Sequence, residues 1–225
     1  MTETLFSGLA RHTARLIKEK FTSINEPKID FTPPFRQIDF IPAIEAALKR
    51  ELPDLASATA QAELVNVFHD LAISVPASET LPRLLDKLSS LFIEPQCTAP
   101  TFVINHPGCL SPLSKSFAHS GSQQYVSARA ELFVNGQEIV NMYEEENSPF
   151  EQRRKFIEQL KYRDGENEAS IDEEYLEALE WGLPPTGGWG CGVDRLCMLL
   201  SGTSRIGDVL SFGTLRNVAA SRKGS

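Results

Sequence analysis

The chain has 225 residues, 41% hydrophobic and 23% charged, with 30 acidic against 22 basic residues and a net charge of −8. It is long enough to bury one sizeable core, and its composition excludes fibrous, disulfide-rich and disordered classes. No apolar run approaches the roughly 20 residues of a membrane span, so no membrane partner is expected. The acidic balance makes this chain alone a poor candidate for nucleic-acid binding. Four cysteines without paired spacing, and an N-terminus unlike a secretory signal, indicate an intracellular protein.

The first part of the chain has the spacing of helices. Apolar residues at helical intervals predict helices over residues 3–19, 42–50 and 55–95, the last interrupted at prolines. Residues 28–34 contain a β-prone run followed by Pro-Pro, which predicts a short strand and a turn.

The middle of the chain changes to strand texture. The β-branched segment Thr101–Ile104 predicts a central strand, and the Pro-, Gly- and Ser-rich residues 106–122 predict a loop. Two β-prone runs, Glu131–Val134 and Gln137–Val140, flank Asn135-Gly136. Both central residues of a two-residue hairpin turn need positive φ, so Asn-Gly predicts a hairpin here.

The last part predicts two charged helices, over residues 149–162 and 171–181, and then a glycine-rich strand that enters an apolar helix at 194–200. Helices followed by strands and then helices indicate an α+β fold, with an antiparallel sheet flanked by helices. We expect a single domain over residues 1–225, with a flexible tail from about residue 217.

Two hairpin carboxylates are candidate metal ligands. With a regular two-residue loop, Phe133 faces Glu138 and Glu131 faces Val140, which puts Glu131 and Glu138 diagonally on one face about 7–8 Å apart. Paired carboxylates suit Mg²⁺ together with a phosphate-bearing ligand. The alternative is a solvated outer face, which is favoured on spacing alone.

Three polar residues beyond the hairpin are candidate ligand contacts. Asn141, Tyr143 and Glu145 share the face opposite the hairpin carboxylates if the strand is regular. A bulge near Ile139 or Val140 would bring them onto the same face. Together they would then offer an amide, an aromatic wall and an anion for an ammonium group. The run of three glutamates here also fits a plain acidic loop.

The glycine-rich run that ends at Arg195 is a candidate anion site. Glycines let a ligand approach the backbone, and a helix N-terminus favours anions. Arg195 is in the first helical turn, where the helix dipole disfavours a cation, so an anionic ligand would explain it. The alternative is a strand–helix connection in which Arg195 pairs with a nearby glutamate.

Taken together, these segments resemble class II lysyl-tRNA synthetases. Residues 137–147 (QEIVNMYEEEN) resemble the lysine-pocket strand of that family, and residues 181–195 (WGLPPTGGWGCGVDR) resemble its motif 3. Ser111-Pro112-Leu113 and Ile171–Tyr175 match further landmarks, and the resemblance extends to about Arg216.

The resemblance implies lysine or a similar amine as ligand, and ATP and Mg²⁺ as cofactors. The implied lysine contacts are Asn141, Tyr143, Glu145 and Gly187. The implied ATP contacts are Gly190, Gly192 and Arg195, and the implied Mg²⁺ ligands are Glu131 and Glu138. Glu138 and Arg195 are the implied catalytic residues. Gly187 stands where the family usually has alanine.

The chain starts where the family is past motif 2, so motifs 1 and 2 and the anticodon-binding barrel are expected to be missing. We therefore expect lysine–tRNA ligase activity to be complete only with a complementary N-terminal half, and tRNA binding by this chain alone is not expected. A sheet cut at this point has an open edge that favours a homodimer or a partner.

Two alternatives differ from a truncated ligase. One is a stand-alone paralogue that performs other chemistry on lysine or another primary amine. The other is a non-catalytic protein that senses lysine or docks on a full-length synthetase. The resemblance leaves the compartment as cytoplasmic or mitochondrial.

Overall fold

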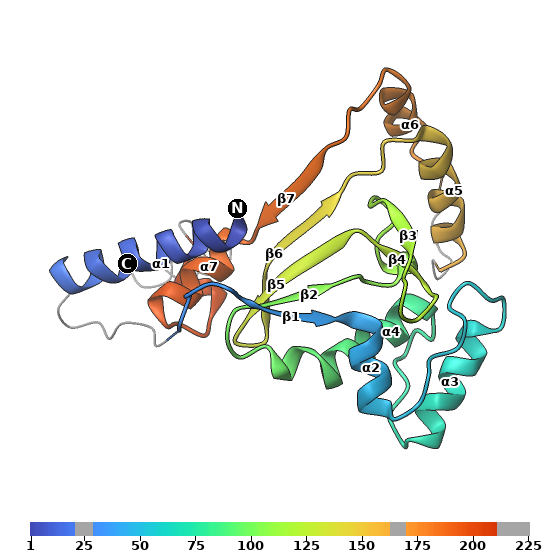
Figure 1. Ribbon diagram of the computed structural model, residues 1–225, viewed down its shortest axis with the longest axis horizontal. Helices are drawn as coiled ribbons and strands as arrows, with labels where there is room; N and C mark the ends of the chain where they lie inside the picture. The colour runs from blue at the N-terminus through green and yellow to red at the C-terminus, as the bar shows by residue number, and fades with distance from the viewer. Residues whose placement is uncertain (21–28, 163–169, 211–225) are drawn as a thin grey trace, which may run out of the picture.

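A five-stranded sheet lies at the centre of the computed structural model, with helices on both of its faces (Figure 1). The structure describes residues 1–20, 29–162 and 170–210. The predicted tail from residue 217 therefore lies outside the described residues.

Helices dominate the first part of the chain, strands the middle, and both kinds of element the last part. The helices are α1 (Thr2–Lys20), α2 (Phe40–Leu48), α3 (Ala60–Asp70), α4 (Leu81–Phe92), α5 (Pro149–Leu160), α6 (Glu173–Glu180) and α7 (Val193–Ser201). The strands are β1 (Arg36–Asp39), β2 (Thr101–Ile104), β3 (Ser116–Ala118), β4 (Tyr125–Ser127), β5 (Arg129–Val134), β6 (Gln137–Glu144) and β7 (Gly187–Cys191). Short 3₁₀ helices cover Glu94–Gln96, Gly108–Leu110 and Ile206–Asp208.

The main sheet has the order β1-β2-β5-β6-β7, and β3 and β4 form a separate two-stranded sheet. Among the strands of the described residues, only β1 and β2 pair in parallel, so the predicted α+β fold with a largely antiparallel sheet is confirmed. Within the described residues, no helix is long and apolar enough to cross a membrane.

The predicted hairpin forms, but with a bulge. Asn135 and Gly136 have φ values of 52° and 70°, as a tight hairpin turn requires. Phe133 pairs with Glu138 as predicted, and the register then shifts so that Glu131 pairs with Asn141. The predicted pairing of Glu131 with Val140 is therefore wrong, and the bulged alternative is correct.

Two other predictions needed correction. Residues 29–35 form no strand, and β1 begins only at Arg36, because the two prolines at 33 and 34 supply no N–H to a ladder. The expected loop over residues 106–122 contains β3, which is too short to show a period-2 pattern in the sequence.

The two faces of the main sheet differ in chemistry. One row of paired residues crosses all the strands on the face that we call the front: Ile38, Val103, Glu131, Asn141 and Gly190. The neighbouring row, on the back face, contains Phe102, Leu132 and Val140, which pack with residues of α1 and α7 in a second hydrophobic core.

On the front face, Ile38, Val103 and Phe133 pack against α2, α3 and α4 in the larger core. We call this β1–β2 side the covered half of the front face. The β5–β7 side, which carries Glu131, Asn141 and Gly190, is the open half. The fold thus buries Ile38, Val103 and Glu131, whereas Asn141 is half-buried and Gly190 is exposed.

Candidate functional site

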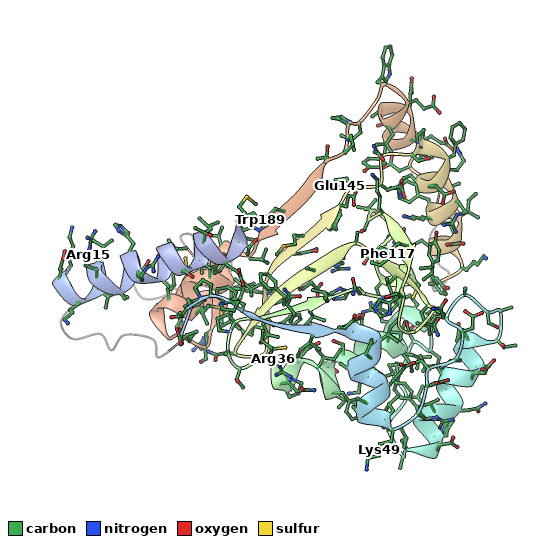
Figure 2. All side chains as sticks on the ribbon, in the orientation of Figure 1. Arg15, Arg36, Lys49, Phe117, Glu145 and Trp189 are labelled. Carbon is green, nitrogen blue, oxygen red and sulfur yellow. The ribbon has the colours of Figure 1, made fainter. Side chains whose placement is uncertain are left out.

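The open half of the front face carries several of the predicted site residues on β5 and β6, and Glu145, directly after β6, is labelled in Figure 2. The bulge in β6 places Glu138 and Asn141 on the face that Glu131 occupies on β5. Tyr143 pairs with Arg129 and so lies on the same face. A cleft of about 810 Å³ lies between Glu131 and Glu138 on one side and α4 on the other.

Glu131 is buried and held by two partners. His106 Nε2 lies 3.0 Å from Glu131 Oε2, and Arg129 donates to Glu131 Oε1. Burial opposes ionisation of this carboxyl, but the His106 contact and the charge of Arg129 outweigh it and lower the pKa of Glu131. Glu131 therefore remains a fixed negative charge.

Glu138 has the opposite tendency. Burial and the nearby Glu131 charge raise the pKa of Glu138, and Arg195 only partly offsets them. Arg195 Nη1 donates to the Glu138 carbonyl oxygen at 2.7 Å and lies 3.5 Å from the carboxylate. The alternative in which Arg195 pairs with a nearby glutamate is thus the arrangement observed.

A cation beside Glu131 and Glu138 would need further oxygen ligands, because both oxygens of Glu131 already contact His106 and Arg129. Across residues 1–20, 29–162 and 170–210, no group of three or more His, Cys, Asp or Glu residues is arranged to hold a metal. Mg²⁺, however, is commonly held by one or two carboxylates plus substrate phosphates. The like-charge repulsion that raises the pKa of Glu138 is relieved by such a cation.

Several buried polar atoms on this face have no protein partner. Within the described part of the chain they include His106 Nδ1, Arg129 Nε and Asn141 Oδ1. Buried polar atoms in folded proteins are nearly always paired, so orphaned atoms point to a ligand or to water.

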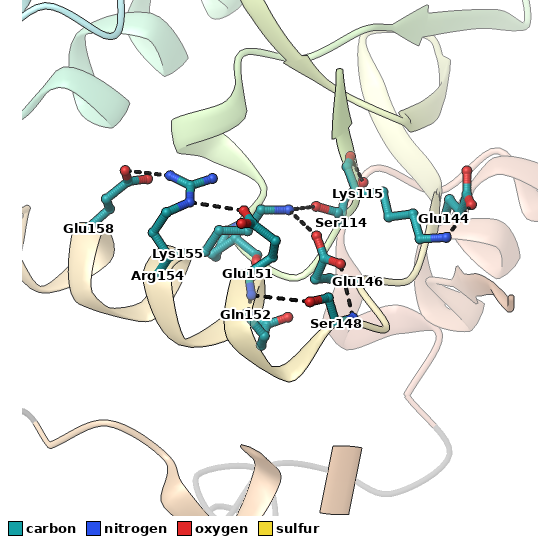
Figure 3. A network of polar contacts seen from close by, with 11 residues as sticks. Ser114, Lys115, Glu144, Glu146, Ser148, Glu151, Gln152, Arg154, Lys155 and Glu158 are labelled. Atoms are coloured by element: carbon teal, nitrogen blue, oxygen red, sulfur yellow. Dashed lines mark hydrogen bonds and ion pairs between the residues drawn. The ribbon is translucent and has the colours of Figure 1, made fainter. Parts of the chain in front are cut away.

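The three consecutive glutamates have different partners (Figure 3). Glu144 accepts from Lys115 Nζ at 2.8 Å, and Glu146 accepts from Lys155 Nζ at 2.7 Å. Among the ion pairs of the described residues, none includes Glu145. Two of the three charges are therefore neutralised internally, and Glu145 is available to an external cation.

The Glu146–Lys155 pair fixes the end of β6. Both side chains are 7% exposed, and Lys155 Nζ also donates to the Ser114 carbonyl. Ser114 in turn forms an isolated bridge with Glu145, and Ser148 N donates to Glu146 Oε1 at 3.1 Å (Figure 3). The buried ammonium of Lys155 thus joins α5 to the two chain segments beside Glu145, at Ser114 and at Glu146.

Glu145 lies against β7. Its N–H donates to the Thr186 carbonyl at 2.9 Å, and its carboxylate lies over Gly188. Burial raises the pKa of Glu145. The pKa values of Tyr143 and of Tyr175 on α6 are raised, mainly by burial and next by the charge of Glu145. Both rings therefore lie near the Glu145 carboxylate.

The glycines of β7 occupy different environments. Gly188 lies beneath the Glu145 carboxylate, whereas nothing lies within 4 Å of a Cβ built on Gly187, whose expected contact with lysine stays a prediction. Gly190 pairs with Asn141, and Gly192 caps α7 beside the Arg195 side chain.

Sequence reasoning missed His106, Arg129 and Asp86. Arg129 is two residues before Glu131 on one strand, so the alternation of side chains could have placed it on the same face. His106 and Asp86, which lines the cleft from α4, come from segments with no local pattern that relates them to the hairpin. Only the packing of distant segments brings them close.

Residues 1–216 match the family of class II tRNA synthetases (D, K and N). The chain is similar to the mitochondrial lysine–tRNA ligase of Schizosaccharomyces pombe, with 41% identity over 94% of this chain and 42% of that protein. It is 40% identical to a probable cytoplasmic lysine–tRNA ligase of Encephalitozoon cuniculi, over 96% of this chain and 44% of that protein. It is 37% identical to a lysine–tRNA ligase of Deinococcus radiodurans, over 96% of this chain and 40% of that protein. The chain thus spans less than half the length of these curated relatives.

Proposed function

The chain belongs to the class II tRNA synthetases (D, K and N), and from this premise we propose that its open half binds lysine and ATP for lysine activation. The observation that carries the proposal is the partnering of the glutamate run. Glu145 alone among the three glutamates has no lysine of the described chain to neutralise it. An ammonium ligand supplies the missing positive charge.

In this proposal the side-chain ammonium of lysine binds the Glu145 carboxylate. Tyr143 forms an apolar wall beside the ligand's methylene groups, and the Asn141 amide offers its orphaned Oδ1 as an acceptor. The two flanking lysines stay on Glu144 and Glu146, so neither competes with the ligand for Glu145.

Glu131 and Glu138 would hold Mg²⁺, which supplies neutralisation of phosphate charge when bound with ATP. Arg195 is half-exposed at the start of α7, so it is free to turn from Glu138 toward a phosphate. The reaction forms a bond between a lysine carboxylate oxygen and the α-phosphorus, and pyrophosphate leaves. A fixed cation at the phosphates stabilises the charge that develops there.

Transfer of lysine to tRNA, and any partner that completes the site, are further proposals, because the chain covers less than half of its curated relatives. We also propose a cytoplasmic or mitochondrial location from the names of those relatives.

A second candidate is amine binding without catalysis or with different chemistry. It is favoured by a contrast within the site: Glu145 is available, whereas Arg195 and both oxygens of Glu131 are already engaged by protein groups. The amine end is therefore formed in advance, and the phosphate end is not.

Calorimetric binding of lysine, followed by lysine-dependent ATP–pyrophosphate exchange, tests both candidates. We expect Glu145→Gln to weaken lysine binding about 10- to 100-fold, as loss of a charged hydrogen bond does. Glu144→Gln is the matched control, because that carboxylate faces Lys115, and its lysine affinity should equal that of the unmodified chain. Binding with exchange supports lysine activation, and binding without exchange favours the second candidate. Equal affinities of the two variants would contradict the role of Glu145.

A further inference from the structure

We propose that Gly188 is a positioning residue for the amine site, because the absence of its side chain lets the Glu145 carboxylate lie across β7. The functional meaning of this inference rests on the proposed role of Glu145 as the ammonium ligand. The position of the carboxylate can be tested without that role.

The geometry around Gly188 is specific. A Cβ at this position would lie 2.1 Å from Glu145 Oε1 and 3.1 Å from Glu145 Cδ, and 3.6 Å from Tyr143 Cε2. The first distance is far below van der Waals contact, so the two groups cannot share the space. The Glu145 carboxylate therefore occupies the space that a side chain at position 188 would take.

The glycine is needed for space and not for backbone conformation. The positive-φ residues of the described chain include Gly136, Gly182 and Gly202 but not Gly188, so alanine is compatible with the backbone at 188. The neighbouring glycines of β7 impose no such limit. A Cβ on Gly187 meets nothing within 4 Å, and one on Gly190 meets only the Asn141 carbonyl at an ordinary 3.9 Å.

An added methyl group at 188 displaces the carboxylate and not the strand. The atom it would meet first is the far end of a flexible side chain, which moves at little cost. The backbone of Glu145 is held from both sides, by the Thr186 carbonyl and by the bridge to Ser114. Gly188→Ala should therefore fold normally and present Glu145 in the wrong place.

The test combines two measurements on the full chain. The first is the pKa of Glu145, from a carboxyl ¹³C titration assigned by comparison with Glu145→Gln. Burial against β7 raises this pKa, so displacement by Gly188→Ala should lower it toward the ordinary value for glutamate. Gly187→Ala is the matched control and should leave the Glu145 pKa unchanged.

The second measurement is the calorimetric Kd for free lysine. Gly188→Ala should raise this Kd at least about tenfold with an unchanged urea midpoint. A double-mutant cycle with Glu145→Asp separates positioning from general damage, because the shorter carboxylate no longer reaches over residue 188. Gly188→Ala should therefore weaken binding less in the Glu145→Asp background than in the unmodified chain.

The outcomes distinguish this inference from the proposed function. If Glu145→Gln weakens lysine binding as expected but Gly188→Ala changes neither the pKa of Glu145 nor the Kd, the inference is overturned and the proposed function stands. If the unmodified chain binds no lysine, the proposed function fails, and the pKa shift alone decides where the carboxylate lies. Additive effects in the cycle would show general damage and overturn the inference.

Discussion

The covered and open halves of the front face are crossed by one row of paired residues and yet are built differently. The row begins at Ile38 and Val103, which pack under α2, α3 and α4, and continues through Glu131 and Asn141 to Gly190. Burial against helices stabilises the first part through apolar area. In the second part, Glu131 faces α4 across the cleft instead of packing against it, and Glu131, Asn141 and Gly190 are charged, polar or lack a side chain.

The difference shows how a sheet accommodates a ligand site without losing its core. On the back face, Leu132 and Val140 of the open half pack with residues of α1 and α7, so the open half is anchored from behind. Its ends are held by ion pairs, above all Glu146 with Lys155. The stability of the open half should therefore depend on ion pairs, whereas the stability of the covered half depends on apolar packing.

The largest effect on stability is expected at Lys155. Lys155→Met leaves the Glu146 carboxylate buried without its cation, which should lower the free energy of unfolding by about 3–5 kcal/mol in urea denaturation. The double variant Lys155→Met with Glu146→Leu removes both charges and should recover most of that loss. A single variant as stable as the unmodified chain would show that this pair does not hold the open half.

One alanine variant in each half of the row compares the stability of the two halves directly. Val103→Ala creates a cavity in the covered half and should cost about 2 kcal/mol of unfolding free energy. Asn141→Ala removes a buried amide oxygen that has no partner, so it should cost under about 1 kcal/mol, although it removes a proposed ligand contact. Equal costs in thermal or urea unfolding would contradict the distinction between the halves.

Glu131 and Glu138 should affect stability in opposite directions with pH. The pKa of Glu131 is lowered in the folded state, so its contribution is present at neutral pH and is lost as the pH falls through that pKa. The pKa of Glu138 is raised, so its charge costs stability at neutral pH, and this cost disappears as the pH falls through its folded-state pKa.

Glu131→Gln should therefore destabilise the chain at pH 7 and Glu138→Gln should stabilise it, with both differences shrinking toward about pH 3. Urea unfolding of the two variants over this pH range provides the measurement. Each variant serves as the control for the other, since both remove one carboxylate from the same face. Shifts of the same sign would show that the two environments are alike.

The smallest effect on stability is expected at the exposed ion pair between Lys115 and Glu144. Lys115 and Glu144 are 30% and 49% exposed, so Lys115→Ala should change the unfolding free energy by no more than about 1 kcal/mol. The difference should decline further in 0.5 M salt, at roughly the screening expected for exposed charges. A salt-independent loss as large as that of Lys155→Met would contradict the contrast between the two lysines.

The local features of the fold followed from the sequence. Asn135-Gly136 predicted the hairpin because few other residues adopt positive φ at both turn positions, and helical spacing predicted most helices within a few residues. β1 and β3 could not be predicted reliably, because strands this short carry little periodicity and depend on pairing with distant segments.

For the site, the sequence by itself determined which chemical groups are present: the carboxylates of the hairpin, the glutamate run, the glycine-rich strand and Arg195. Only the tertiary structure decided which of these act together. The bulge places Asn141 and Tyr143 on the same face as Glu131. Packing against α5 pairs Glu146, and not Glu145, with Lys155. Glu146 and Lys155 are only nine residues apart, but Lys155 also donates to the Ser114 carbonyl, 41 residues away, and no local pattern of residues records the energy of such packing.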